Sequence, residues 1–304
     1  MIEMQDCKTR CGFVALVGAP NSGKSTLTNA LVGAKVSIVT HKAQTTRGPV
    51  RGIVLAGDAQ VILVDTPGIF QPKRRLDRAM AQTAWNRAAD ADLVALVIDG
   101  ARGIDEKLEP ILEHLPKINR PVIAVLNKVD LVKKPNLLSL TADLLALKTF
   151  DEVFMVSALT RDGVEDLKAY LAGVVPEGPW LFPEDQLSDA SLRRTAAEIT
   201  REKLFLRLHE ELPYALTVET TEWKTLRNGS VRIEQTIFVE RESQRRIVLG
   251  AKGTMIKEIG QAARTEIAEI AGLPVHLFLF VKVRERWGED PERFREMGLD
   301  YPKG

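Results

Sequence analysis

The sequence predicts an α/β fold for its first part, a mostly parallel sheet flanked by helices, followed by a smaller α+β domain. Short apolar runs alternate with amphipathic stretches over residues 12–175. A stretch rich in glycine, proline and acidic residues interrupts this pattern at 172–189, and the order of elements changes after it. The length of 304 residues also exceeds the ~100–200 residues usual for one domain. We therefore predict a first domain of residues 1–175, a linker of 176–190, and a second domain of 191–304 that includes a C-terminal tail.

The predicted strands of the first domain are apolar runs of the kind that is buried on both faces of a sheet. Helical stretches separate most of them, so most neighbouring strands should run parallel, with ligands at their carboxyl ends. In chain order the predicted strands are GFVALVG, VRGIVLA, VILVDTPG, DLVALVID, PVIAVLN and EVFMVSA.

The composition is that of an ordinary globular protein, with 45% hydrophobic and 27% charged residues and a net charge of +1. Bulk charge therefore does not indicate nucleic acid. No apolar run approaches the ~18–20 residues that span a bilayer, and the first residues lack the order of a secretion signal, so we expect a cytoplasmic protein. Cys7 and Cys11 have no second pair or histidine cluster near them, which favours reduced bystander thiols over a metal site.

A phosphate-binding loop directly follows the first strand. Residues 18–25 read GAPNSGKS, which matches G-x-x-x-x-G-K-[ST] in the required strand-loop-helix context. Glycines let backbone N–H groups approach a triphosphate, and a helix N-terminus supplies more donors. Lys24 is expected to reach the β- and γ-phosphates and Ser25 to bind Mg²⁺. The predicted nucleotide contacts of this loop are Gly18, Pro20, Asn21, Ser22, Gly23, Lys24, Ser25 and Thr26.

Two further segments are candidates for the metal and the γ-phosphate. Asp65 ends a strand and opens the sequence DTPG, so its carboxylate can hold Mg²⁺ directly or through water, and the Gly68 amide can face the γ-phosphate. Thr46 is the preferred hydroxyl to complete the magnesium shell, with Thr45 second. We predict Ser25, Thr46 and Asp65 as metal ligands and Lys24, Thr46 and Gly68 as catalytic residues.

The sequence NKVD at 127–130 follows an apolar strand and indicates which base is bound. The Asp130 carboxylate can accept hydrogen bonds from guanine N1–H and the 2-amino group, which adenine lacks. Asn127 can contact the other edge of the base or tie the loops together, and Lys128 can lay its methylene chain over the ring. Ser157, Ala158 and Leu159 follow the last strand and are expected to offer a backbone amide to the guanine O6.

Together these motifs resemble the five-motif set of GTPases over residues 12–175, and residues 19–21 and 45–47 resemble the bacterial Era/TrmE/EngA group. The resemblance implies binding of GTP and GDP with Mg²⁺. Ile69 stands where Ras-like proteins carry a water-orienting glutamine, so slow intrinsic hydrolysis is expected. In some relatives the counterpart of Asn21 helps hold K⁺, which makes potassium a candidate cofactor; a loop-shaping amide is the alternative.

The second domain is expected to hold a helix near 191–208, strands near 215–222, 231–239 and 275–283, and a helix over 256–270. A G-x-x-G sequence at 250–253, set in this order, resembles a type II KH domain, whose loop clamps about four nucleotides of single-stranded nucleic acid. Ile247, Val248, Leu249 and Ile256 are candidates for an apolar floor. Trp287 either stacks on a base or covers the core, and we favour the core. The predicted RNA-binding residues are Arg245, Arg246, Gly250, Ala251, Lys252, Gly253 and Lys257.

A GTPase domain joined to a C-terminal KH domain through FPED at 182–185 resembles the Era family of ribosome-assembly GTPases. The resemblance implies binding near the 3′ end of 16S ribosomal RNA and a role in maturation of the 30S subunit, by what we expect to be a monomer. Family members also occur at the inner membrane face, so peripheral membrane contact stays open. One alternative is a GTPase whose C-terminal domain grips protein or membrane. Another is a phosphate-transferring metabolic enzyme, which residues 127–130 argue against.

Overall fold

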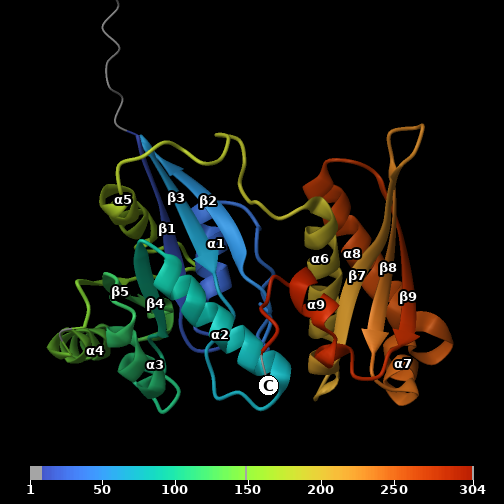
Figure 1. Cartoon of the computed structure of the whole chain (residues 1–304), viewed down its shortest axis with the longest axis horizontal. Helices are drawn as coiled ribbons and strands as arrows, with labels where there is room; N and C mark the ends of the chain where they lie inside the picture. Colours follow the sequence, from blue (N-terminus) through green and yellow to red (C-terminus); the bar gives the residue numbers. More distant parts are fainter. Residues whose placement is uncertain (1–8, 148, 303–304) are drawn as a thin grey trace, which may run out of the picture. The chain divides into compact units, whose positions relative to one another are not determined.

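The computed structural model describes residues 9–147 and 149–302. The described residues form two compact units: the first holds residues 9–37, 46–147, 149–189 and 297–302, and the second holds Ile38–Thr45 and Ala190–Glu296. Figure 1 shows the helices and strands of each unit. Cys11 is a buried free thiol, whereas Cys7 lies outside the described residues.

The first unit is built on a six-stranded sheet in the order β2-β3-β1-β4-β5-β6. Neighbouring strands are parallel except β2 and β3, which form an antiparallel pair joined at Gly57, whose φ of 58° suits a tight turn. The mostly parallel α/β fold is thus confirmed. The strands are β1 (Arg10–Val17), β2 (Val50–Ala56), β3 (Ala59–Asp65), β4 (Leu93–Asp99), β5 (Val122–Asn127) and β6 (Glu152–Met155).

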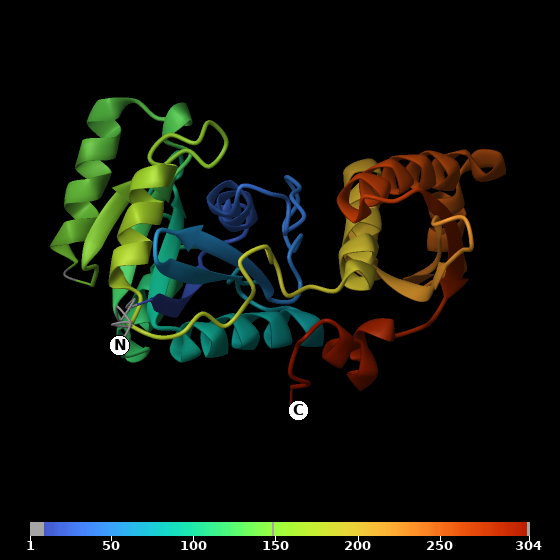
Figure 2. The same cartoon turned by 90° about the horizontal axis from the view of Figure 1, so that it is seen from above.

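Helices cover both faces of this sheet and give it two cores (Figure 2). One core packs Leu27 of α1 and Leu167 of α5 against the sheet, and the other packs Ala84 of α2 and Leu144 of α4 against the opposite face. Burial on both sides explains why the strands are continuous apolar runs. The helices are α1 (Lys24–Val32), α2 (Arg75–Asp90), α3 (Glu109–His114), α4 (Lys134–Ala146) and α5 (Val164–Val174), with 3-10 turns at Leu115–Lys117 and Val129–Leu131.

The stretch predicted as a linker lies along the first unit as a strap. Gln60 of β3 is fully buried, and its Oε1 accepts hydrogen bonds from the backbone N–H groups of Leu181 and Phe182 at 2.9 and 3.0 Å. Its Nε2 donates to the Phe182 carbonyl at 2.8 Å, and Ser188 bridges to Gly52 of β2. A buried amide whose donors and acceptors are satisfied by the strap fixes this segment in place.

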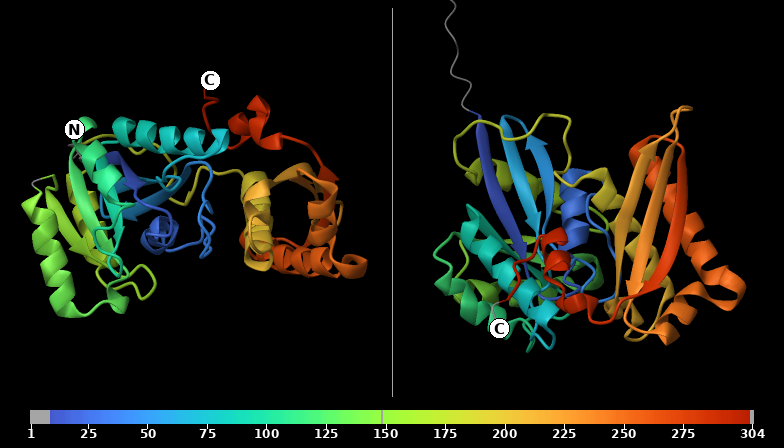
Figure 3. Two further views of the ribbon diagram at one scale, coloured as in Figure 1. Left: turned by 90° about the horizontal axis from the view of Figure 1, so that it is seen from below. Right: turned by 45° about the vertical axis from the view of Figure 1, so that its right-hand side comes forward.

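The second unit is a three-stranded sheet, β7-β8-β9, in which β7 and β8 are antiparallel and β8 and β9 parallel. Apolar side chains of α6, α7 and α8 pack on one face of it, among them Leu204, Val248 and Ile259 (Figure 3). Trp287 is buried and donates to the Ala215 carbonyl at 3.0 Å, which confirms its assignment to the core. The elements are α6 (Leu192–Arg207), β7 (Leu216–Thr225), β8 (Val231–Val239), α7 (Glu242–Leu249), α8 (Thr254–Ala271), β9 (Val275–Val283) and α9 (Pro291–Glu296), with 3-10 turns at Leu212–Ala215, Ala251–Gly253 and Trp287–Glu289.

Candidate functional site

The loop between β1 and α1 has a backbone that only glycine allows at two positions. Gly18 has φ of 148°, and a Cβ there would lie 2.4 Å from the Val97 carbonyl oxygen. Gly23 has φ of 96°, and a Cβ would lie 2.1 Å from the Asn127 Nδ2. Asn21 also has a left-handed backbone, with φ of 65°. These conformations wrap the loop in front of the first turn of α1, where unpaired N–H groups favour an anion.

Lys24 is the cation of this loop and is buried. Its Nζ donates to the carbonyls of Gly18 and Ala19 at 3.0 and 2.9 Å. Burial lowers the pKa of Lys24 to about 8, and the nearby Asp65 carboxylate opposes this shift. The ammonium is therefore held at the loop by weak carbonyl acceptors, which the phosphate oxygens of a nucleotide can replace with stronger, charge-assisted hydrogen bonds.

Oxygen side chains converge beside Lys24. The hydroxyls of Ser25 and Thr46 lie 2.8 Å apart. The Asp65 carboxylate is fully buried, and neither oxygen has a hydrogen-bond partner among residues 9–147 and 149–302. Burial raises the pKa of Asp65, although the nearby Ser25, Lys24, Ser37 and Thr46 lower it in part.

An orphaned buried carboxylate beside hydroxyls is the oxygen-rich ligand set that Mg²⁺ prefers. The described residues contain no cluster of three or more His, Cys, Asp or Glu side chains able to hold a metal by themselves. Phosphate oxygens of a bound nucleotide, together with water, would complete the shell of a magnesium ion here. Thr45, the second choice at this site, is engaged elsewhere: its hydroxyl lies 2.6 Å from that of Thr40 and donates to the Lys42 carbonyl at 2.7 Å.

The turn after β3 is docked on the phosphate loop. A Cβ on Gly68 would lie 2.9 Å from the Pro20 Cα, and the Ile69 N–H donates to the Gly18 carbonyl at 3.0 Å. The Ile69 side chain is buried in the core next to α2. An isoleucine side chain has no polar atom, and this one also does not face solvent. It therefore cannot orient an attacking water.

Asn127 ties three loops together at the end of β5. Its Nδ2 donates to the Ser22 carbonyl at 2.9 Å, and its Oδ1 accepts from the N–H groups of Lys128 and Ala158 at 2.8 and 3.0 Å. Asn127 thus ties the loops together rather than leaving its amide free for the base. Asp130 follows on an exposed 3-10 turn with its carboxylate open to a ligand.

The loop after β6 offers fewer free amides than its sequence suggests. The Ala158 N–H is taken by Asn127, and the Ser157 N–H donates to the Asp162 carbonyl at 2.9 Å. Leu159 is 80% exposed, which leaves its amide as the candidate donor to a base.

In the second unit, the G-x-x-G loop joins α7 to α8. A Cβ on Gly250, where φ is 74°, would lie 2.6 Å from the Met255 Cβ, so this glycine is required by packing. Gly253 has φ of 78°, a Cβ there would meet open space, and its N–H donates to the Gly250 carbonyl at 3.2 Å. Ala251 and Lys252 between them are exposed, and Lys252 is left-handed with φ of 51°.

The basic side chains around this loop differ in availability. Arg246, Lys252 and Lys257 are exposed. Arg245 is less free, because it donates to the Val281 carbonyl at 3.2 Å and pairs with Glu242 at 2.8 Å. Of the residues expected to form an apolar floor, Ile247 is 56% exposed and can contact a ligand. Val248 is buried in the core and cannot.

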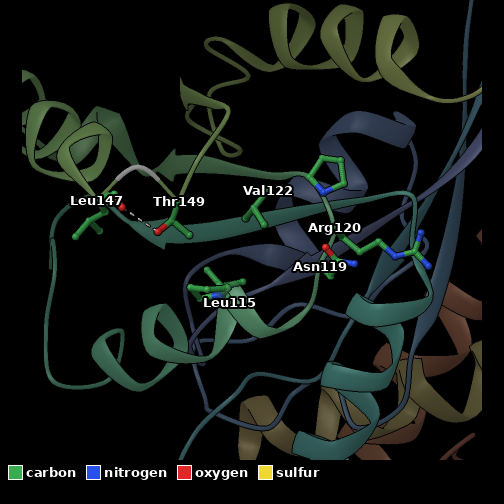
Figure 4. Close-up of a pocket in the computed structure, with 8 residues that line it drawn as sticks. Leu115, Asn119, Arg120, Val122, Leu147 and Thr149 are labelled. Carbon is green, nitrogen blue, oxygen red and sulfur yellow. Dashed lines mark hydrogen bonds between the residues drawn. The ribbon is translucent and has the colours of Figure 1, made fainter.

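A depression lies at the opposite end of the parallel sheet (Figure 4). It opens at Val122, the first residue of β5, whereas the nucleotide loops follow the carboxyl ends of the strands. It is therefore separate from the site above. Its lining residues are Leu115, Pro116, Asn119, Arg120, Pro121, Val122, Leu147 and Thr149.

The fold and loops define a P-loop GTPase with a C-terminal KH domain. A family model described as 50S ribosome-binding GTPase matches residues 13–128, and a KH domain model matches residues 211–288. The chain belongs to the Era family of GTPases. It is 63% identical to GTPase Era of Afipia carboxidovorans, covering 100% of this chain and 98% of the relative, and 63% identical to GTPase Era of Brucella suis biovar 1, covering 99% and 96%.

Solved structures of Era proteins resemble the chain over both units. A single-substitution variant of Aquifex aeolicus Era bound to GDP.AlF4⁻ superimposes with a TM-score of 0.91 at 39% identity, covering 95% of this chain and 99% of that one. A structure of Era with MgGDPNP and nucleotides 1506–1542 of 16S ribosomal RNA has the same TM-score of 0.91, identity of 39% and coverage of 95% and 99%. The chain is thus a GTPase that binds a guanine nucleotide with Mg²⁺. No described helix combines the length and apolar composition needed to cross a bilayer.

Proposed function

We propose that the chain is a nucleotide-dependent switch whose output is binding of ribosomal RNA. The observation that carries the site assignment is the orphaned Asp65 carboxylate beside the Ser25 and Thr46 hydroxyls. GTP supplies the remaining magnesium ligands, and Lys24 and the Gly68 amide hold the γ-phosphate. Because Ile69 cannot orient water, intrinsic hydrolysis is slow.

The segment that leads into Thr46 supports the switch. Residues 38–45 belong to the second unit, where the Val39 N–H donates to Glu202 of α6 at 2.9 Å and the Lys42 Nζ donates to the Leu208 carbonyl at 2.5 Å. Ordering of Thr46 on magnesium changes the position of this segment, and hydrolysis releases it. Nucleotide state thereby biases RNA binding.

Guanine selection by Asp130 is the part of the site most open to test. We expect Asp130→Ala to weaken GDP binding by at least tenfold while the fold is kept, because an exposed carboxylate contributes little to stability. Calorimetric titration with GDP, GTP and ATP measures this. Equal binding of ATP and GTP by the unaltered chain, or unchanged GDP affinity in the variant, would overturn the assignment.

The RNA proposal rests on the exposed Lys252 of the G-x-x-G loop and the exposed Arg246 and Lys257 beside it. A structural relative binds nucleotides 1506–1542 of 16S ribosomal RNA, so we propose the 3′ region of 16S RNA as the ligand of this chain. Lys252→Ala should weaken binding of a single-stranded RNA of that sequence and reduce its salt dependence. Arg227→Ala is a matched control, because it removes one exposed cation at the β7–β8 turn instead.

We further propose that the chain assists assembly and maturation of the 30S subunit. The family description that names the 50S particle matches only residues 13–128, whereas the relative with 16S RNA matches both units. Cross-linking of the GTP-bound protein to cellular RNA, followed by sequencing, distinguishes a role on the 30S subunit from a role on the 50S subunit. Reads clustered at the 3′ end of 16S RNA support the proposal; capture of membrane or protein without RNA favours the alternative role of the second unit.

Three finer proposals have separate tests. We propose that K⁺ near Asn21 supports GTP hydrolysis. Replacing K⁺ by Na⁺ should therefore slow hydrolysis, and Asn21→Ala should remove the difference between the two ions.

We propose a cytoplasmic monomer. Cell fractionation measures its location, and analytical sedimentation measures its oligomeric state. Peripheral contact with the inner membrane predicts a fraction that salt washes from membranes.

A further inference from the structure

Asp99 lies at the end of β4, beside the loop that reads guanine, and none of the motifs of the site includes it. In the parallel β4–β5 pair its register partner is Asn127, so the two strands end side by side. The Gly100 N–H donates to the Asn127 carbonyl at 2.8 Å just beyond this pair. The backbone of Asp99 is thereby fixed to the strand that carries the guanine-reading residues.

The Asp99 carboxylate is the anionic anchor of Lys128. The Lys128 Nζ donates to Asp99 Oδ2 at 2.6 Å and to the Asn21 carbonyl at 2.7 Å. The other carboxylate oxygen accepts from the Ala101 N–H at 3.1 Å, which holds the group in one orientation. The side chain of Asp99 is 12% exposed and that of Lys128 is 31% exposed, so water screens this pair only in part.

Lys128 is consequently stretched between the guanine loop and the phosphate loop. Its backbone is left-handed, with φ of 65°, and its N–H donates to the Asn127 Oδ1 at 2.8 Å. Its Cε lies 3.9 Å from where a Cβ on Gly23 would be. A strained backbone at one end and an ion pair at the other leave the methylene chain little freedom.

We propose that Asp99 is a positioning residue for nucleotide binding, which holds the Lys128 chain as a preformed wall of the guanine site. The proposal rests on the assignment of residues 127–130 to the base. Without Asp99 the ammonium loses its anionic partner and keeps its bond to the Asn21 carbonyl, so the side chain must be ordered again each time nucleotide binds. That ordering cost lowers affinity for GTP and GDP alike.

A double-mutant cycle on the full chain tests this, with GDP affinity measured by calorimetry. Asp99→Asn should weaken GDP binding about tenfold, since a partly exposed charge-assisted hydrogen bond is worth roughly that factor. In a Lys128→Ala background the same change should have less than a twofold effect, because the two residues act through one contact. In steady-state hydrolysis, Asp99→Asn should raise KM more than it lowers kcat.

Arg102→Ala is the matched control, because Arg102 also lies near Asp99, at 3.8 Å, but its side chain is 46% exposed and its contact is with the carboxylate rather than with Lys128. It should leave GDP affinity unchanged. Asp99→Glu, which keeps the charge, should recover part of the loss and serves if Asp99→Asn folds poorly. Equal effects of Asp99→Asn with and without Lys128, or no effect in either, would overturn the proposal. If Asp130→Ala left GDP affinity unchanged, the assignment of residues 127–130 to the base would be wrong, and that outcome is distinct from a failure of the Asp99 proposal.

Discussion

Replacing Asn127 with alanine should destabilise the first unit as well as weaken nucleotide binding. The Asn127 side chain is 1% exposed and makes its hydrogen bonds to Ser22, Lys128 and Ala158 across three loops. The bonds to Ser22 and Ala158 are buried, so their backbone groups would be left without partners, whereas the Lys128 N–H is only part-buried and water can reach it. At about 1–3 kcal/mol for each buried group left unpaired, the loss in the free energy of unfolding is about 3 kcal/mol.

Urea unfolding of the nucleotide-free chain, followed by circular dichroism, measures this loss. For a unit of this size it corresponds to a fall in Tm of roughly 6–12 °C. Asn136→Ala is the control, because Asn136 is exposed on α4, and it should change stability by less than about 0.5 kcal/mol. If Asn127→Ala unfolded within that same margin of the unaltered protein, the tie between the loops would not stabilise the fold and the reasoning would be wrong.

Because burial raises the pKa of Asp65, the charged carboxylate destabilises the nucleotide-free fold; Asp65→Asn should raise Tm by an amount that grows from acidic to neutral pH, and should abolish the Mg²⁺ dependence of GTP binding. Because the pKa of Lys24 is lowered to about 8, GDP affinity should fall as pH rises above that value, and a calorimetric series that stays flat to pH 9 would contradict this. The stability of the nucleotide-free fold should rise with pH over the same range, up to the pKa of an unfolded lysine. Gly250→Ala should cost about 2 kcal/mol or more in chemical denaturation, because its Cβ meets Met255 at a strained φ, whereas Gly253→Ala, which faces open space, should cost only about 1 kcal/mol.

Most of the fold and the loops of the site could be predicted from sequence because their signals are local. Buried parallel strands are continuous apolar runs. The phosphate loop needs glycine at Gly18 and Gly23, because both positions have positive φ and no room for a Cβ. The same holds for α8, whose apolar residues repeat at helical spacing. In the second unit, the alternation along β8 marks one buried face.

Other features depend on residues far apart in the chain, and only the tertiary structure decides them. The ion pair of Asp99 with Lys128 exists because β4 and β5 end together, and the strap at Leu181 and Phe182 is held by Gln60 of β3, more than a hundred residues earlier. An aspartate after an apolar strand, or a glutamine within one, has no local signature of such a partner. The sequence by itself therefore determined which chemistry the loops carry, since that depends on residue type and spacing. Which side chains hold those loops in place was decided by packing, because a hydrogen bond depends on distance in space and not on distance along the chain.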